Sequence, residues 1–173
     1  MKSVGGLFNL DGRTALITGG SRGLGLQIAE ALGQYGARIV LTARKADELE
    51  IAQLHLQERG IDASYLVADV ASPDAIASLI DASLEGLERV DILVNTAGAS
   101  WGAPAEDYPL EAWDKVFNLN VRGLFLLSQQ IAKRSMIPNR YGRILNIASI
   151  AGLRGNPPGT LQTIAYNAAK GAV

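Results

Sequence analysis

The segment "RTALITGGSRGLG" (residues 13–25) decides the fold class of this chain. Its first half is an apolar run that is typical of a buried strand. Its second half is a glycine-rich turn that leads directly into a helical pattern. Glycines allow a tight turn and bring the backbone close to a pyrophosphate, which the free N–H groups at the helix N-terminus stabilise. The segment predicts a nucleotide-binding strand–turn–helix unit, whose helix should bury Leu24, Ile28, Ala31, Leu32 and Tyr35.

Further apolar runs follow, and helical patterns separate them. The runs are almost continuously apolar, which is typical of strands in a parallel sheet that helices cover on both faces. Alternation of this kind predicts an α/β fold of the Rossmann type, with a doubly wound parallel sheet in a three-layer α/β/α arrangement. We expect strands at 13–18, 37–42, 63–68, 90–95 and 142–149, and helices from 24, at 46–59, at 73–87 and at about 110–135.

The helix after the third strand has the clearest beginning. Ser72 can cap it, and Pro73 suits the first helical position because the missing N–H is not needed there. Its expected buried face comprises Ile76, Leu79, Ile80, Ser83, Leu84 and Leu87.

Composition narrows the class of protein. The 173 residues are 48% hydrophobic and 19% charged, which fits one globular domain over 1–173. The net charge is −1 and the basic residues are scattered, so we expect neither nucleic acid nor a membrane as partner. The absence of cysteine excludes disulfides and thiolate chemistry. His55 is the only histidine, so no metal site is expected. No apolar segment reaches membrane-spanning length, and we expect a cytoplasmic protein.

Five motifs occur in a fixed order along the chain: "TGGSRGLG" (18–25), "NTAG" (95–98), "NVRG" (120–123), "NIASIAG" (146–152) and "YNAAK" (166–170). Together they resemble the motifs of the short-chain dehydrogenase/reductase family and cover the chain from Arg13 to its last residue. Thr96 departs from the family, which has a second asparagine in "NTAG". The resemblance implies an oxidoreductase that interconverts a ketone and a secondary alcohol with a nicotinamide cofactor.

The segment "LTARK" (41–45) bears on which nicotinamide cofactor binds. A carboxylate at the end of the second strand binds a ribose 2′-hydroxyl, whereas arginine pairs with a 2′-phosphate. Ala43 stands where NAD-dependent members carry aspartate, Arg44 follows, and Arg22 lies in the glycine turn, so NADP(H) is favoured over NAD(H). Asp69 resembles the family aspartate at the adenine edge, although a plain strand-end aspartate is an open alternative. The cofactor-binding residues implied are Gly19, Ser21, Arg22, Gly23, Leu24, Gly25, Arg44, Asp69, Val70, Asn95, Ala97, Gly98, Tyr166 and Lys170.

Tyr166 and Lys170 lie one helical turn apart and project from one face. An ammonium group near a tyrosine favours the phenolate form, which makes proton exchange easier. The resemblance implies a catalytic set of Asn120, Ser149, Tyr166 and Lys170. In it, Tyr166 protonates the carbonyl oxygen, Ser149 hydrogen-bonds the same oxygen, Lys170 holds the nicotinamide ribose and Asn120 positions a proton-relaying water.

The substrate remains open between 3-oxoacyl thioesters, as in the family's acyl-carrier-protein reductases, and sugar acids, as in its gluconate dehydrogenases. The opening "LFNLDGRTALITGGSRGLG" (7–25) resembles the latter. Ser149 and Tyr166 are 17 positions apart, longer than is usual, and "RGNPPGTLQT" (154–163) is expected to form a loop on the substrate side. Trp101 could border the substrate or pack in a loop, and Trp113 is expected to pack at the start of the long helix.

The resemblance also implies a fold that continues beyond the tyrosine–lysine pair. We therefore expect the N-terminal part of a longer enzyme, lacking the C-terminal strands of the full fold, with the fifth strand as an apolar edge. Full-length members commonly form homodimers or homotetramers through the long helix and the tyrosine-bearing helix. A non-catalytic NADPH-binding protein that senses or sequesters the cofactor is the rival interpretation.

Overall fold

The computed structural model describes residues 4–157 and 159–173. In this part of the chain, five parallel strands form one sheet in the order β3-β2-β1-β4-β5. The order reverses at β1, since β2 and β3 lie on one side of it and β4 and β5 on the other. The predicted strands are confirmed, with shifted ends: β1 Thr14–Thr18, β2 Arg38–Ala43, β3 Ala63–Val67, β4 Ile92–Asn95 and β5 Arg143–Asn146.

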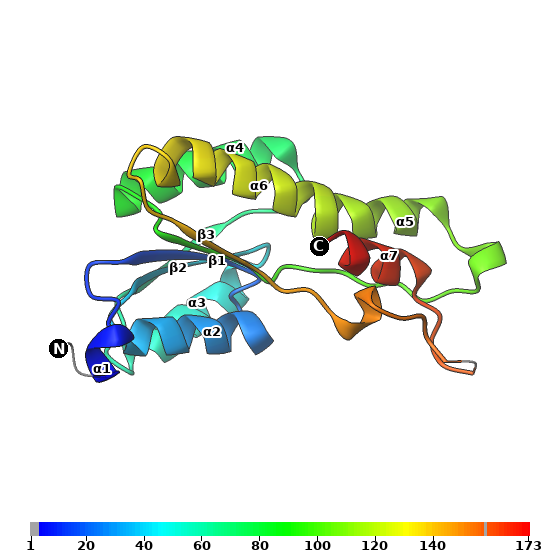
Figure 1. Ribbon diagram of the computed structural model, residues 1–173, viewed down its shortest axis with the longest axis horizontal. Coiled ribbons are helices and arrows are strands. Elements are labelled where there is room, and N and C mark those ends of the chain that lie inside the picture. The colour runs from blue at the N-terminus through cyan, green and yellow to red at the C-terminus, as the bar shows by residue number, and fades with distance from the viewer. Residues whose placement is uncertain (1–3, 158) are drawn as a thin grey trace.

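Helices cover both faces of the sheet, as Figure 1 shows. α2 (Gly23–Gln34) and α3 (Ala46–Gln57) lie on one face, and α4 (Pro73–Leu87) and α6 (Leu124–Ile131) lie on the other. α5 (Leu110–Phe117) extends the line of α6 beyond the sheet, where it packs near α7 (Ile164–Ala172). The short helix α1 (Val4–Leu7) lies near the N-terminus. The doubly wound three-layer arrangement is therefore confirmed.

The two layers enclose separate cores because successive side chains of a strand point to opposite faces. Ala15 and Ile17 of β1 belong to the core beneath α2 and α3, whereas Leu16 belongs to the core beneath α4 and α6. All five residues of β1 are buried, as expected for a central parallel strand.

The buried face predicted for α2 is partly wrong. Gly25 and Ala29 are its buried residues, and Leu24 is 61% exposed. Ala31 and Tyr35 are exposed as well, while Ile28 and Leu32 pack against the core as predicted. The reason is the close approach of the helix to the glycine turn, where a Cβ on Gly25 would overlap the backbone oxygen of Gly19. Small residues therefore face inward, and Leu24 is left exposed beside the glycine turn.

The beginning of α4 matches the prediction. The Ala75 N–H donates to Ser72 Oγ over 3.4 Å, and Pro73 takes the first helical position. Five of the six residues predicted for its buried face are buried, and Leu84 is partly buried against the same core.

The long helix predicted at 110–135 is present but not uniform. Between α5 and α6 the backbone is π-helical over Asn118–Gly123, and a second π-helical stretch, Ala132–Met136, follows α6. Short 3-10 helices occur at Ala105–Asp107 and Ile150–Gly152. Within the described residues, no helix combines the length and apolar character needed to cross a membrane.

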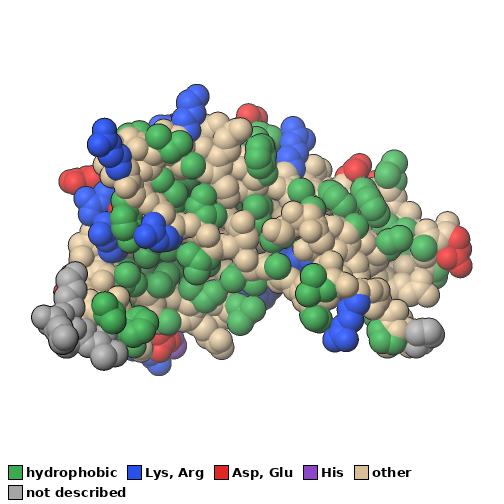
Figure 2. Space-filling model, in the orientation of Figure 1, with side chains coloured by type: hydrophobic (Ala, Val, Ile, Leu, Met, Phe, Trp, Pro, Cys, Tyr) green, Lys and Arg blue, Asp and Glu red, His purple; other side chains and the backbone are tan. Residues whose placement is uncertain are grey.

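Strand β5 forms one edge of the sheet, and its outer side has no strand partner among the described residues. Ile144 and Leu145 are 40% and 41% exposed. Figure 2 shows hydrophobic side chains at the surface on the side of the molecule along which β5 runs. The expected apolar edge is therefore confirmed.

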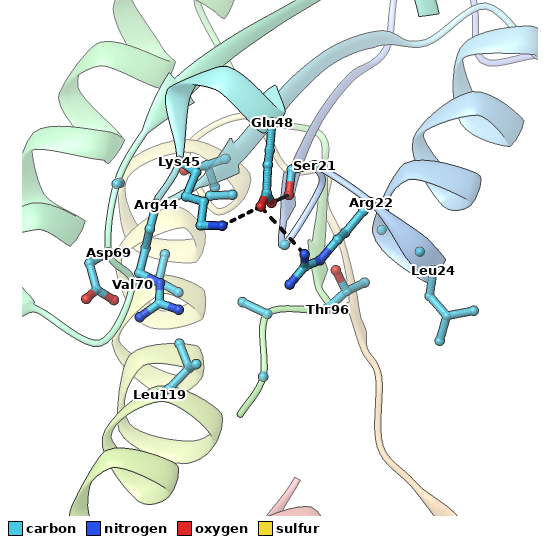
Figure 3. A pocket seen from close by; sticks show the side chains of 18 of the residues that line it. Ser21, Arg22, Leu24, Arg44, Lys45, Glu48, Asp69, Val70, Thr96 and Leu119 are labelled. Carbon is cyan, nitrogen blue, oxygen red and sulfur yellow. Dashed lines mark hydrogen bonds and ion pairs between the residues drawn. The ribbon is translucent and has the colours of Figure 1, made fainter. Parts of the chain in front are cut away.

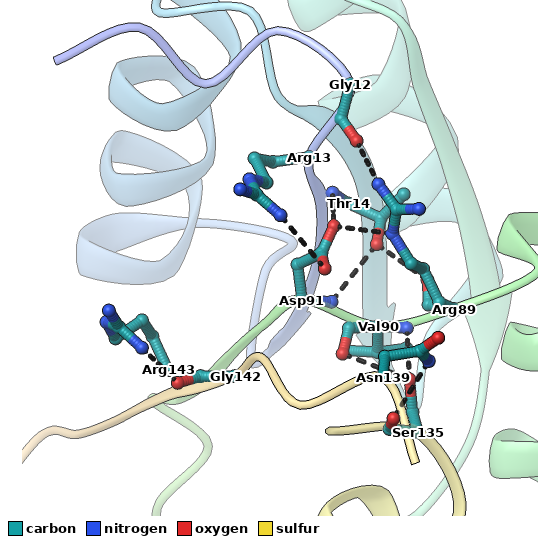
Figure 4. Close-up of polar contacts among 10 residues, drawn as sticks. All are labelled: Gly12, Arg13, Thr14, Arg89, Val90, Asp91, Ser135, Asn139, Gly142 and Arg143. Atoms are coloured by element: carbon teal, nitrogen blue, oxygen red, sulfur yellow. Dashed lines mark hydrogen bonds and ion pairs between the residues drawn. The ribbon is translucent and has the colours of Figure 1, made fainter. Parts of the chain in front are cut away.

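At the amino-terminal ends of the strands, remote from the glycine turn, a polar network surrounds Asp91 (Figure 4). The Asp91 carboxylate accepts hydrogen bonds from the Thr14 N–H (3.2 Å) and Arg89 Nε (3.0 Å), and Arg13 lies 3.6 Å away. Ser135 Oγ accepts from the Val90 N–H over 2.8 Å, which ties the end of the long helix to the same loop. These contacts fix the spacing of β1 and β4 at the end remote from the glycine turn.

Candidate active site

A cavity of about 410 Å³ opens at the carboxyl ends of the strands, beside the reversal of strand order at β1 (Figure 3). In open α/β sheets this position is the usual one for ligands. The lining residues come from the glycine turn, the end of β2, the loops after β3 and β4, and two later segments. They are Gly19, Ser21, Arg22, Gly23, Leu24, Gly25, Thr42, Ala43, Arg44, Lys45, Glu48, Ala68, Asp69, Val70, Thr96, Ala97, Gly98, Leu119 and Ile147.

The glycine turn has a conformation that other residues would strain. Gly19 and Gly23 have φ values of +65° and +58°, in the left-handed region that favours glycine. The turn then enters α2, whose first residues, 23–25, line the cavity. This is the geometry predicted for holding a pyrophosphate.

Thr96 binds the loop after β4 to this turn. Its hydroxyl donates to the backbone oxygen of Thr18, and its N–H donates to Thr18 Oγ1 over 3.1 Å. The Ala97 N–H donates to the same hydroxyl, also over 3.1 Å. The departure from the family motif at Thr96 thus supplies a contact between the loop after β4 and the last residue of β1.

A charged cluster lies at the β2 end of the cavity. Glu48 accepts hydrogen bonds from Lys45 Nζ (2.7 Å) and Ser21 Oγ (3.2 Å), and Arg22 lies 3.6 Å away. The hydrogen bond from Lys45, followed by the positive charges of Arg22 and Lys45, lowers the pKa of Glu48. Arg44 lies beside this cluster and lines the cavity. Sequence reasoning missed Lys45 and Glu48, although Glu48 lies in the first turn of the helix that follows β2, where side chains face the carboxyl edge.

Most of the predicted cofactor residues line this cavity, but Asn95 does not. The Asn95 amide donates to Ser128 Oγ (3.0 Å) and Asn146 Oδ1 (2.9 Å), so it joins β4 to α6 and β5. Asp69 lines the cavity, and its Oδ1 accepts from the Ala71 N–H over 3.0 Å. Tyr166 and Lys170 do not line the cavity, and of the two Lys170 contacts the lining residue Ile147.

Lys170 links the tyrosine-bearing helix to the cavity wall. Its Nζ donates to the backbone oxygen of Ile147 over 2.5 Å and lies 5.8 Å from the centroid of the Tyr166 ring. Lys170 is buried, and this burial lowers the pKa of its ammonium group. The predicted pair therefore shares one helix face beside the carboxyl end of β5.

Ser149 lies at the cap of the 3-10 helix Ile150–Gly152, where its Oγ accepts from the Ala151 N–H over 3.2 Å. α7 packs directly on this short helix. A Cβ on Gly152 would lie 2.5 Å from the backbone oxygen of Lys170, so the contact requires glycine. The serine segment and the tyrosine-bearing helix are thus held against each other.

Asn120 is buried within the π-helical stretch of the long helix. Its Oδ1 accepts from the Ala99 N–H (2.8 Å), and its Nδ2 donates to the Ala99 oxygen (2.9 Å). The side chain therefore fixes the loop after β4 directly beyond Gly98, a cavity residue.

The segment 154–163 forms the predicted loop, apart from Pro158, which lies outside the described residues. Asn167 fastens the loop to α7, since its amide donates to the Arg154 oxygen (3.1 Å) and to Asn156 Oδ1 (3.1 Å). The Ala103 N–H donates to the Gln162 oxygen over 3.0 Å, so the loop meets the segment that follows Trp101.

Trp113 and His55 do not line the cavity and contact other side chains. Trp113 stacks on Phe117 with ring centroids 4.7 Å apart, as its predicted packing role requires. His55 Nε2 lies 2.8 Å from Glu30 and joins α3 to α2.

The chain is similar to known proteins over nearly its whole length. The sequence model described as short chain dehydrogenase matches residues 13–173. The chain is 40% identical to the gluconate 5-dehydrogenase of Gluconobacter oxydans over 96% of this chain and 63% of that protein. It is also 40% identical to the rhamnolipids biosynthesis 3-oxoacyl-[acyl-carrier-protein] reductase of Pseudomonas aeruginosa, over 96% of this chain and 64% of that protein. The chain thus spans just under two thirds of the length of these curated relatives.

A solved structure shows the same architecture. It is the gluconate 5-dehydrogenase of Burkholderia cenocepacia in complex with NADP and tartrate, which superposes with a TM-score of 0.87 at 34% identity. The similarity covers 95% of this chain and 63% of that one.

Proposed function

The chain belongs to the short-chain dehydrogenase family, and on that premise we propose that it interconverts a ketone and a secondary alcohol with a nicotinamide dinucleotide. The observation that carries the proposal is the juxtaposition at the carboxyl end of β5. Buried Lys170 donates to Ile147, a wall residue of the cavity, and Tyr166 lies beside it on the same helix. We further propose that residues 1–173 act as one cofactor-binding domain.

The residues present fit a dinucleotide. The left-handed glycines of the turn and the N-terminus of α2 suit a pyrophosphate. Arg22, Arg44 and Lys45 line one end of the cavity, which supports NADP(H) over NAD(H) because guanidinium and ammonium groups pair with a 2′-phosphate. The Burkholderia relative described above was solved with NADP, which supports the same preference. Asp69 is proposed to contact the adenine edge.

When bound, a nicotinamide would supply the hydride in the reducing direction and accept it in the oxidising direction. In the reducing direction, the Tyr166 hydroxyl donates its proton to the carbonyl oxygen, while the Ser149 hydroxyl donates a hydrogen bond to the same oxygen. The Lys170 ammonium favours the phenolate that remains on Tyr166 and holds the ribose hydroxyls. Asn120 is proposed to position the water that returns a proton.

Two substrate classes remain in the proposal, 3-oxoacyl thioesters and sugar acids. Of the two curated relatives, one is named as a gluconate dehydrogenase and the other as a 3-oxoacyl-[acyl-carrier-protein] reductase. Turnover of an acetoacetyl thioester and of 5-ketogluconate with NADPH would distinguish them. We also propose a cytoplasmic enzyme that forms a homodimer or homotetramer through the α5–α6 helix and α7.

The test of the function is Tyr166→Phe, which removes only the hydroxyl. We expect turnover to fall by about 10²–10⁴-fold, because general acid catalysis is lost, while the Kd for NADPH stays unchanged. Steady-state kinetics and calorimetric titration measure the two quantities.

Tyr35→Phe is the matched control, since Tyr35 is exposed and follows α2 at the end of that helix away from the glycine turn. A Tyr166→Phe protein with full activity would contradict the proposed mechanism. A wild-type protein that binds NADPH but reduces neither substrate would favour the non-catalytic binding protein.

A further inference from the structure

Glu48 occupies the middle of the charged cluster at the β2 end of the cavity (Figure 3). One carboxylate contacts three groups: Lys45 Nζ at 2.7 Å, Ser21 Oγ at 3.2 Å and Arg22 Nη1 at 3.6 Å. Its side chain is only 25% exposed. The low pKa of this carboxyl keeps it ionised at neutral pH.

The groups that Glu48 contacts come from the walls of the nucleotide cavity. Arg22, Arg44 and Lys45 are the cationic side chains that line it in the described part of the chain. Two of these three are paired with Glu48. Arg44 is the one with no ion pair among the described residues.

A 2′-phosphate and a 2′-hydroxyl experience this carboxylate differently. The phosphate carries nearly two negative charges at neutral pH, so Glu48 repels it and competes with it for Arg22 and Lys45. A ribose hydroxyl is uncharged and can donate a hydrogen bond to a carboxylate.

We propose that Glu48 is a specificity-determining residue, which weakens the binding of NADP(H) and thereby narrows its advantage over NAD(H). The inference rests on the proposed dinucleotide function of the same cavity. In this arrangement Arg44 can pair with the 2′-phosphate without breaking an existing ion pair. Arg22 and Lys45 can pair with the phosphate only if they give up their contacts with Glu48.

The test is Glu48→Gln, which removes the charge and keeps the size of the side chain. We expect NADPH to bind about five- to tenfold more tightly, by the Coulomb energy of one charge near a dianion in a wet site. NADH should change by less than about twofold. Adenosine 2′,5′-bisphosphate and adenosine 5′-monophosphate, which differ only in the 2′-phosphate, should repeat this contrast. All four ligands are measured by calorimetric titration.

Glu50→Gln is the matched control, because Glu50 is exposed on the same helix and is not a wall residue of the cavity. We expect its affinities to equal those of the wild type. Glu48→Ala removes the same charge and should show the same tightening if the glutamine variant folds poorly. Raising the salt concentration should reduce the effect in each case.

Three outcomes overturn the inference. Unchanged or weaker NADPH binding in the Glu48 variants would mean that the carboxylate organises the cations for the phosphate. Equal tightening of NADPH and NADH would show an effect unrelated to the 2′-phosphate. A wild-type protein that binds none of the four ligands would instead contradict the proposed function itself.

Discussion

At the scale of a single residue, Lys170 has two opposing effects on stability: its hydrogen bond favours the fold, and its burial disfavours it. Its ammonium donates to the Ile147 oxygen, which secures α7 to the cavity wall. Its burial, however, disfavours the charged form and lowers its pKa. A buried cation beside Tyr166 therefore has a cost in stability that an exposed lysine would not have.

The lowered pKa predicts a dependence of stability on pH. The unfolded chain holds the Lys170 proton more tightly than the folded one, so this group costs stability while both states are protonated. The cost is relieved as pH rises from the folded pKa towards 10.5, the value for an unperturbed lysine. We expect the free energy of unfolding of the wild type, relative to that of Lys170→Met, to increase between neutral pH and pH 10.5. Urea unfolding at several pH values measures it, and a constant or falling difference would contradict the prediction.

Sequence reasoning identified individual residues where a motif names them. The glycine turn, Arg22 and Arg44 were placed at the cavity by motif and strand position, and they line it. Lys45 and Glu48 were missed because no motif marks them, and their part depends on how the first turn of α3 meets the glycine turn in space. Asn95 follows the motif but has its amide engaged by Ser128 and Asn146.

At the scale of elements, the relative position of the Ser149 and Tyr166 segments depends on one close contact between two helices. α7 packs on the 3-10 helix Ile150–Gly152. Gly152 leaves room for the Lys170 backbone there, because a Cβ would lie 2.5 Å from its oxygen and 2.6 Å from its carbonyl carbon. Because Gly152 has no side chain, the segment that carries Ser149 can approach the helix that carries Tyr166 this closely.

Gly152→Ala should separate these two helices. We expect a loss of about 1–3 kcal/mol in the free energy of unfolding, as for overpacked sites, because the added methyl group meets backbone. Hydrogen exchange of residues 164–172 should become faster, which locates the effect in α7.

Gly86→Ala is the matched control for that substitution. No atom lies within 4 Å of a Cβ at Gly86, which is in the last turn of α4. Helix propensity then predicts a gain of up to about 1 kcal/mol. Equal effects of the two substitutions would mean that the contact with Lys170 is not limiting.

Element boundaries show where local sequence stops being sufficient. The strands and α4 were predicted to within a few residues because apolar runs and a cap are local signals. The π-helical stretch Asn118–Gly123 was not predicted, since the hydrophobic periodicity continues through it. β5 ends at Asn146, three residues before its predicted end, because its partner β4 ends at Asn95. The residues of β5 alone do not contain the information on where β4 ends.

At the scale of the whole molecule, the two ends of the sheet carry different features. The carboxyl end carries the cavity, and the amino end carries the ion pairs around Asp91 (Figure 4). The Asp91 side chain is 2% exposed, and its carboxylate contacts Arg13, Arg89 and the Thr14 N–H.

Asp91→Asn should destabilise the fold by about 1–3 kcal/mol, since it weakens the charge-assisted hydrogen bonds that the buried carboxylate accepts, while the partly exposed arginines can still be hydrated. The affinity for NADPH should stay unchanged, because the site lies at the other end of the strands. Asp62→Asn, at a carboxylate that is 76% exposed and paired with Arg38, should cost less than about 0.5 kcal/mol. Chemical denaturation and calorimetry test both statements, and equal losses in the two variants would show that burial does not govern these pairs.

The strand order has a consequence for folding while the chain is synthesised on the ribosome. β1 is central, and β2 and β3 pair outward from it, so one half of the sheet is complete in the nascent chain at Val67. All the cavity walls except Leu119 and Ile147 have been synthesised by Gly98. At about 5–20 residues per second, roughly 4–14 s then pass before the ribosome adds Lys170. A dinucleotide that binds as proposed can therefore meet most of its pocket before the helix that carries Tyr166 exists.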